Sequence, residues 1–202
     1  MGIFIVFEGI DGAGKTTQIP LLYRNLTRIG YAPLLTHEPG GTPLGDSVNK
    51  WLKKYPERSP LTELLLMCSA RSEHITKVIK PALDQGRIVI CDRYSPSTIA
   101  YQGHGRGLEL ELIQEVNFRA TQGLEPDLIV LLNIPVSTAY TRKPNRKHDG
   151  FETEKKEFHQ RIKDGYLALA SANDKKWLTI DGNLPKSTIA AQIWDRVNVM
   201  LT

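Results

Sequence analysis

A glycine-rich loop near the N-terminus constrains the fold of this chain more than any other feature. Residues 9–16 read GIDGAGKT and satisfy G-x-x-x-x-G-K-[ST], after the apolar run Ile3–Phe7 and before a helix-length stretch. The glycines let the backbone curl so that successive N–H groups point into one concavity, at the positive end of the following helix. The sequence therefore predicts a strand, a phosphate-binding loop and a helix, and with them a bound nucleoside triphosphate.

The residues expected to bind ATP are the loop itself and the start of the helix. Lys15 supplies a point charge for the outer phosphates, and the Thr16 hydroxyl is suited to Mg²⁺. A coincidental Gly-rich turn is the weaker interpretation, because the pattern and both flanks fit. The expected ATP-binding residues are Gly9, Ile10, Asp11, Gly12, Ala13, Gly14, Lys15, Thr16 and Thr17.

Five short apolar runs, each bounded by Gly, Pro or Asp, are predicted to be buried strands. Stretches of helical length, with apolar residues three or four apart, lie between them. Continuous apolar strands alternating with helices indicate a parallel sheet covered on both faces. We predict an α/β fold, a three-layer doubly wound arrangement with a five-stranded parallel sheet. The strands are expected at Ile3–Phe7, Pro33–Thr36, Arg87–Cys91, Leu128–Asn133 and Trp177–Ile180, and the helices at Lys15–Ile29, Leu61–Asp84, Leu110–Gln122, Glu152–Ser171 and Ser187–Leu201.

One segment departs from this composition. Residues 141–156 read TRKPNRKHDGFETEKK, which is too polar for a core and too short for a domain. We expect a single domain over 1–202, with 141–156 as a mobile, mostly basic lid at the carboxyl side of the sheet. An ordinary solvated loop followed by a helix start is the alternative.

Composition excludes several classes of protein. The chain is 41% hydrophobic and 24% charged, so it can bury a core. Its net charge of +4 fits a phosphate-bearing ligand but is too small to indicate nucleic acid. Cys68 and Cys91 have no metal or redox spacing and are expected to be buried in a reducing compartment. No apolar run approaches the ~20 residues of a membrane span, and no signal peptide opens the chain, so we expect a cytoplasmic protein without a membrane partner.

A second chemical signal is the sequence Cys91-Asp92-Arg93-Tyr94 at the end of the third apolar run. Asp92 there is suited to hold Mg²⁺ or its water shell, directly or through Thr16, and Arg93 to bridge the transferring group and an acceptor phosphate. Ligands gather at the carboxyl ends of strands in such sheets. The alternative is a surface turn that contains an Asp-Arg pair.

Arg71 stands in the otherwise apolar stretch LLLMCSAR. A guanidinium on such a face is costly to bury unless it pairs with a carboxylate, a phosphate or a base edge. Two interpretations are open: a structural ion pair with Glu63 or Glu73, or recognition of a polar ligand in an apolar pocket.

These residues carry a resemblance to the bacterial thymidylate kinases, which are P-loop nucleoside monophosphate kinases. The resemblance implies transfer of the γ-phosphoryl group of ATP to dTMP, giving dTDP and ADP for dTTP synthesis. It also implies Mg²⁺ as cofactor and a homodimer. The matching segments are FEGIDGAGKTTQ at 7–18, HEPGGTPLG at 37–45, SARSEHITKVIKPAL at 69–83, CDRYSPSTIAYQGHGRGL at 91–108, PDLIVLLNIP at 126–135 and FHQRIKDGYLALA at 158–170.

The resemblance implies a role for each matching residue of the acceptor site. Asp11 would accept a hydrogen bond from the 3′-hydroxyl of dTMP. Glu38 and Pro39 would help form the pocket, and Arg93 would hold the acceptor phosphate. Arg71 would bind the thymine edge.

Four further positions complete the implied acceptor site. Ser97 and Gln102 would also address the base, and the Tyr101 ring would crowd the 2′ side of the sugar and so select deoxyribose. Met67 stands where the family usually has a thymine-stacking Phe, and His37 stands where it usually has an Arg before EPGG.

The source of the transition-state cation also departs from the family pattern. Family members place an extra Arg in the phosphate loop or in the lid. This loop has none, and the lid motif reads Asp149-Gly150-Phe151-Glu152 without its Arg. We therefore expect a catalytic lid cation, with Arg146 preferred over Arg142 and Lys147, to act beside Lys15, Asp92 and Arg93. Arg142 has the alternative of stacking on adenine.

Two rival functions remain to be weighed. A nucleoside monophosphate kinase with another base preference is kept open by Met67. A nucleotide-dependent switch or partner-binding ATPase would need the phosphate loop and an Asp, but would not need EPGG, Arg71 or the AYQG stretch. We prefer the kinase because all of these are present.

Overall fold

Five parallel strands form the middle layer, in the order β2-β3-β1-β4-β5. In the computed structural model, which describes residues 2–142 and 156–201, every neighbouring pair of strands is parallel. The predicted α/β class with a five-stranded parallel sheet is confirmed, and each strand lies within one residue of its predicted limits. The strands are β1 (Ile3–Glu8), β2 (Leu34–His37), β3 (Ile88–Asp92), β4 (Leu128–Asn133) and β5 (Trp177–Asp181).

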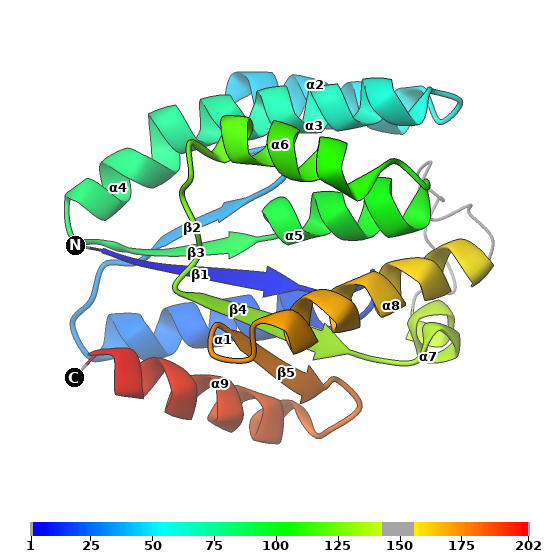
Figure 1. Ribbon diagram of the computed structural model, residues 1–202. Helices are drawn as coiled ribbons and strands as arrows, with labels where there is room; N and C mark the ends of the chain where they lie inside the picture. Colours follow the sequence, from blue (N-terminus) through cyan, green and yellow to red (C-terminus); the bar gives the residue numbers. More distant parts are fainter. Residues whose placement is uncertain (1, 143–155, 202) are drawn as a thin grey trace.

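Helices cover both faces of the sheet (Figure 1). Side chains on the central strand alternate between two cores: Ile5 and Phe7 pack in the core that includes α1 and α9, whereas Phe4 and Val6 pack against η1 and α4. Both faces of β1 are therefore apolar, which explains its uninterrupted apolar sequence. One layer holds α1 (Lys15–Arg28) and α9 (Lys186–Leu201), and the other holds α3 (Pro60–His74), the π-helical turn η1 (Ile75–Ile79), α4 (Lys80–Asp84) and α6 (Leu110–Thr121).

Three helical segments near the site are absent from the sequence prediction: α2 (Pro43–Lys54), α7 (Val136–Arg142), and α5 (Ser95–Thr98) with its π-helical continuation η2 (Ile99–Gly105). The cause at α2 is local, because it begins directly after the Gly-rich EPGGT segment. Its cap is clear in the structure, where the Thr42 hydroxyl accepts a hydrogen bond from the Gly45 N–H at 3.0 Å.

The predicted helix Leu61–Asp84 is helical throughout but is not a single α-helix. The chain runs from α3 through the π-helical turn η1 into α4, at whose start Pro81 lies. Proline lacks an N–H and cannot continue the α-helical ladder, so a change of hydrogen-bonding pattern next to it is expected.

Helix α8 (Lys156–Ala172) lies beside η2 and β4. The predicted start of this helix at Glu152, and nearly all of the predicted lid, fall outside the described residues. None of the helices within the described ranges is both long and apolar enough to cross a membrane.

Candidate active site

The phosphate loop connects β1 to α1 and turns over the end of β4. Gly9 adopts φ +134°, and a Cβ there would lie 2.6 Å from the carbonyl oxygen of Leu132. A side chain at this position would therefore force the loop away from β4. The side chains of Ile10 and Ala13 are buried in the core, so only their backbone atoms face the concavity.

Lys15 lies at the first position of α1, with its ammonium beneath the loop. Its Nζ donates to the Gly9 carbonyl oxygen at 2.9 Å and is 4.0 Å from Asp92 Oδ1. Burial, and then the charge of Arg93, lower the pKa of Lys15, while Asp92 and Asp11 oppose them. Thr16 and Thr17 follow on the exposed side of the first helical turn.

Asp92 ends β3, directly beside Phe7 of β1 in the sheet register. Its Oδ1 is buried and has no hydrogen-bond partner in the described part of the chain. No group of three or more His, Cys, Asp or Glu that could hold a metal occurs among the described residues. Mg²⁺ at a nucleotide needs only one or two protein ligands, because phosphates and water supply the rest. Asp92 and the Thr16 hydroxyl therefore fit Mg²⁺ in this setting.

Arg93 occupies the left-handed region with φ +73°, which is costly for a residue with a side chain and is found mainly at functional sites. Its guanidinium makes four contacts. Nη2 donates to Asp11 Oδ1 at 2.9 Å and to the Tyr101 hydroxyl at 3.1 Å. Nη1 donates to the hydroxyls of Tyr166 at 3.1 Å and Ser97 at 3.3 Å. The side chain is thus fixed between the phosphate loop, η2 and α8.

A buried carboxylate, Glu8, lies behind Arg93 and was missed by the sequence reasoning. Its side chain is fully buried and accepts hydrogen bonds from the N–H groups of Tyr94 and Ser97, and from the hydroxyls of Ser97 at 2.7 Å and Tyr166 at 2.8 Å. Burial raises the pKa of Glu8 above its ordinary value, against the opposing charge of Arg93. The sequence pattern that could have identified Glu8 is a charged residue at the end of an otherwise apolar strand.

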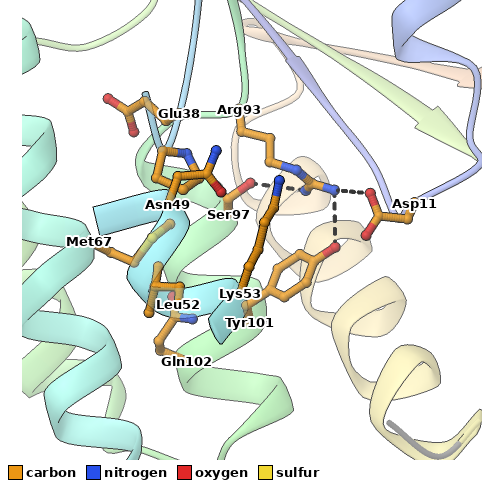
Figure 2. Close-up of a pocket in the computed structure, with 11 residues that line it drawn as sticks. Asp11, Glu38, Asn49, Leu52, Lys53, Met67, Arg93, Ser97, Tyr101 and Gln102 are labelled. Carbon is orange, nitrogen blue, oxygen red and sulfur yellow. Dashed lines mark hydrogen bonds and ion pairs between the residues drawn. The ribbon is translucent and has the colours of Figure 1, made fainter. Parts of the chain in front are cut away.

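A cavity of about 200 Å³ opens beside Arg93, between α2, α3 and η2 (Figure 2). It brings together every predicted substrate residue except Arg71. Three lining residues were missed, and all three come from the unpredicted helix α2: Asn49, Leu52 and Lys53. The predicted residues that line the cavity are Asp11, Glu38, Pro39, Met67, Arg93, Ser97, Tyr101 and Gln102.

Arg71 lies behind Glu38 and is fully buried. Its ion-pair partner is Glu38, at 2.7 Å from Nε, and not Glu63 or Glu73, the two acids nearer in sequence. Nη1 donates to Thr98 Oγ1 at 2.8 Å and to Asn117 Oδ1 at 2.6 Å. Nη2 is buried without a hydrogen-bond partner among the described residues, so one edge of the guanidinium still has N–H groups to offer.

Glu38 is held in turn by His74, whose Nδ1 is 3.2 Å from Glu38 Oε1 and whose Nε2 is 2.5 Å from Thr36 Oγ1. The second glycine of EPGG makes room for this ring, since a Cβ on Gly41 would lie 2.5 Å from Nε2 of His74. The EPGG segment therefore positions a carboxylate that orients Arg71.

The cavity has an excess positive charge, which comes from Lys53. Asp11 pairs with Arg93, and Glu38 pairs with Arg71. Lys53 extends from α2 into the cavity, toward the side where Arg93 lies (Figure 2), and no hydrogen bond or ion pair joins it to a described residue. Such a cavity favours an anionic ligand.

Arg142 ends α7 next to the phosphate loop. It donates to the carbonyl oxygens of Gly12 at 3.3 Å and Gly182 at 3.0 Å. The other lid candidates, Arg146 and Lys147, lie outside the described residues, as does Asp149–Glu152.

A phosphate loop with a second cavity beside it, whose charge favours an anion, is typical of a nucleotide phosphotransferase. The family profile described as thymidylate kinase matches residues 7–193. The chain is 47% identical to the thymidylate kinase of Dehalococcoides mccartyi strain CBDB1, over 100% of this chain and 98% of that protein. It is 45% identical to the thymidylate kinase of Geobacter sp. strain M21, over 91% and 85%.

A solved structure agrees with these sequence relatives. The crystal structure of thymidylate kinase from Ehrlichia chaffeensis matches with a TM-score of 0.81 and 35% identity, covering 97% of this chain and 98% of that one. The chain therefore belongs to the thymidylate kinase family, which phosphorylates dTMP to dTDP with ATP. The predicted resemblance is confirmed.

Glu8 should make the stability of the fold decrease as the pH rises. The folded chain holds the Glu8 proton more tightly than the unfolded chain. The free energy of unfolding therefore falls as the pH rises from the ordinary Glu pKa of 4.5 through the raised pKa of the folded chain. Glu8→Gln has no such proton, and its free energy of unfolding should fall less. Urea unfolding at several values between about pH 5 and 8 measures the two slopes. Glu111→Gln, an exposed control, should keep the parent slope, and equal slopes for parent and Glu8→Gln would contradict the prediction.

Proposed function

We propose that the cavity beside the phosphate loop binds dTMP, and that the chain transfers the γ-phosphoryl group of ATP to it, giving dTDP and ADP. One observation carries this assignment: Arg93 lines the cavity and is bonded to Asp11 of the phosphate loop at 2.9 Å. The donor and acceptor sites therefore share a boundary at which a phosphoryl group can pass directly between them. In the reaction, a phosphate oxygen of dTMP bonds to the γ-phosphorus while the bond to the leaving ADP oxygen breaks, so no side chain is needed as nucleophile.

On the donor side, the N–H groups of the phosphate loop and the Lys15 ammonium bind the phosphates of ATP. Thr16 and Asp92 would hold Mg²⁺, because Asp92 Oδ1 has no hydrogen-bond partner among the described residues. Mg²⁺, when bound, neutralises charge on the phosphate oxygens during transfer. Asp92 also lies 4.0 Å from Lys15, which aligns the ammonium with the metal ligand.

On the acceptor side, the two ends of the cavity differ in chemistry (Figure 2). Arg93 and Lys53 would bind the phosphate of dTMP, and Asp11, which also lines the cavity, would accept from the 3′-hydroxyl. Met67, Leu52 and Gln102 lie at the other end of the cavity and would surround the thymine. Tyr101, between them and fixed by Arg93, would exclude a 2′-hydroxyl. Four further residues complete the site. The pocket walls would be formed by Glu38 and Pro39, and the base edge would be contacted by Arg71 and Ser97.

A panel of acceptors tests this function. We expect dTMP to give a higher kcat/KM with ATP and Mg²⁺ than dUMP, dCMP, dGMP or AMP. A clear preference for another nucleotide would show a kinase with a different base specificity, and nucleotide hydrolysis without phosphoryl transfer would overturn the proposal.

Three lysines should separate the two subsites. Lys15→Ala should lower kcat by roughly 100-fold or more, because its charge acts on the transferring phosphoryl group. Lys53→Ala should raise the KM for dTMP by roughly tenfold while leaving the KM for ATP unchanged. Lys54→Ala, next along α2 and outside the cavity, should change neither by more than about twofold. Near-normal turnover in a folded Lys15→Ala protein would contradict the donor-site assignment.

We also propose that the chain is one kinase domain with a lid at about 141–156, and that a lid cation stabilises the transferring group. The support is that no Arg occurs in the phosphate loop, while Arg142 already contacts the Gly12 carbonyl oxygen. Replacing the correct residue among Arg142, Arg146 and Lys147 by Ala should lower kcat, by up to the 10³–10⁵-fold seen for arginine fingers. If all three variants and the triple variant keep kcat within about threefold, the lid cation is absent.

The proposed assembly is a homodimer that works in the cytoplasm. Helices α3 and α6 pack together through an apolar cluster, yet their outer faces expose Leu61, Leu65, Leu112 and Phe118, the last at 62%. Exposed apolar side chains on two helices that pack together are suited to an interface. Both cysteines are free and buried, as suits a reducing compartment. Sedimentation should give twice the chain mass of 22.7 kDa; a stable monomer at micromolar concentration would contradict the dimer.

A further inference from the structure

Two buried polar atoms near the base end of the cavity have no hydrogen-bond partner among the described residues. One is Nη2 of Arg71, which can only donate, and the other is Oε1 of Gln102, which can only accept. Gln102 lines the cavity directly, whereas Arg71 is bonded to the cavity residue Glu38. Buried polar atoms are normally paired, so an unpaired donor and an unpaired acceptor here indicate a ligand edge that offers the complementary pair.

The orientation of the Gln102 amide is what makes Oε1 available. Gln102 Nε2 donates to Glu63 Oε1 at 2.6 Å, and this contact is buried. An ionised carboxylate only accepts hydrogen bonds, so it requires the NH₂ end of the amide and repels the carbonyl end. Glu63 therefore keeps the NH₂ end of the Gln102 amide turned toward itself, and the carbonyl oxygen at the other end remains for a ligand.

Glu63 is itself held by two arginines and does not line the cavity. Its side chain is buried, with Oε2 at 2.7 Å from Arg58 Nη2 and 3.5 Å from Arg106 Nη2. Arg58 is fixed further, because its Nη1 donates to the carbonyl oxygens of Leu52 and Tyr55, both at 2.8 Å. The carboxylate that faces Gln102 is thus fixed by two ion pairs.

We propose that Glu63 determines the base selectivity of this kinase by locking the Gln102 amide with its carbonyl oxygen toward the bound base. This inference rests on the proposed function. A carbonyl oxygen accepts from the N3–H that thymine and uracil share, and it opposes the N3 of cytosine, which carries no hydrogen. Glu63 does not touch the substrate, so it is a positioning residue.

The unpaired N–H groups of Arg71 reinforce the same choice. They suit the O4 acceptor of thymine and oppose the amino group that cytosine carries at that position. Sites that leave polar groups unpaired with the wrong ligand discriminate strongly, because each unpaired buried group loses its hydrogen bonds to water without replacing them. The Gln102 carbonyl oxygen and the Arg71 N–H groups together would bind the N3–H and O4 of the base, which distinguish dTMP and dUMP from dCMP.

Glu63→Gln tests the proposal, with kcat/KM measured for dTMP, dUMP and dCMP. An amide at 63 can either donate or accept, so Gln102 becomes free to turn its NH₂ toward the base. The ratio of dTMP to dCMP should fall roughly 10- to 100-fold, the effect of one hydrogen bond to a charged group. The ratio of dTMP to dUMP should stay within about twofold, because both bases carry N3–H. Glu57→Gln, an exposed control on the segment before α3, should leave both ratios unchanged.

The possible results are distinguishable. A parent enzyme that phosphorylates none of the three nucleotides would overturn the proposed function. A parent that prefers dTMP, with the same dTMP to dCMP ratio in Glu63→Gln, would overturn only the role of Glu63. A variant that loses activity toward all three nucleotides in equal proportion would show that Glu63 is purely structural, and would also overturn the proposal.

If Glu63→Gln does not fold, the nitrogen-15 spectrum of the parent decides. A locked amide predicts that the Gln102 side-chain NH₂ is protected from hydrogen exchange in the free enzyme and equally in the dTMP complex. Protection that develops only when dTMP binds would mean that the substrate orients Gln102, and would overturn the assignment to Glu63.

Discussion

The buried carboxylate of Glu8 is the contact on which the geometry of the site depends. It ends β1 and accepts hydrogen bonds from the segment that follows β3 and from Tyr166 on α8. These same hydroxyl groups, on Ser97 and Tyr166, accept from Arg93. The central strand, the segment after the neighbouring strand and helix α8 thus meet at one carboxylate. Arg93 can hold its strained backbone conformation because this network and Asp11 fix its side chain.

Electrostatic pairing divides the cavity beside Arg93, and the residues behind it, into two regions. Near the phosphate loop, Arg93 and Lys53 exceed the charge of Asp11 and leave room for an anion. Elsewhere in and behind the cavity wall, Glu38 pairs with Arg71, and Glu63 pairs with Arg58, in two buried ion pairs. A buried ion pair contributes little net stability, because desolvation of the charges offsets their attraction. Its value in this protein lies in fixing which hydrogen-bonding groups face the ligand.

The sheet could be predicted because its signals are local. Strands such as Ile88–Asp92 are buried on both faces and so are written as unbroken apolar runs, bounded by residues that end strands. Helix α2 was missed because it directly follows a Gly-rich segment, which favours a loop, and because it buries only Gly45, Val48 and Leu52. Because no helix was predicted there, the side chains of Asn49, Leu52 and Lys53 could not be assigned to a helix face, and their place in the cavity wall was missed.

The sequence by itself determined the phosphate loop, the parallel α/β architecture and, through resemblance, most of the residues that line the acceptor cavity. These features depend on residues close together in the chain, where spacing and backbone geometry suffice. Only the tertiary structure decided the pairing of the buried charges. Arg71 pairs with Glu38 across 33 positions instead of with the nearby Glu63, Gln102 reaches Glu63 across 39, and Tyr166 reaches Glu8 across 158. Strand order and helix packing set these distances, and neither is encoded in the local spacing of the residues that meet.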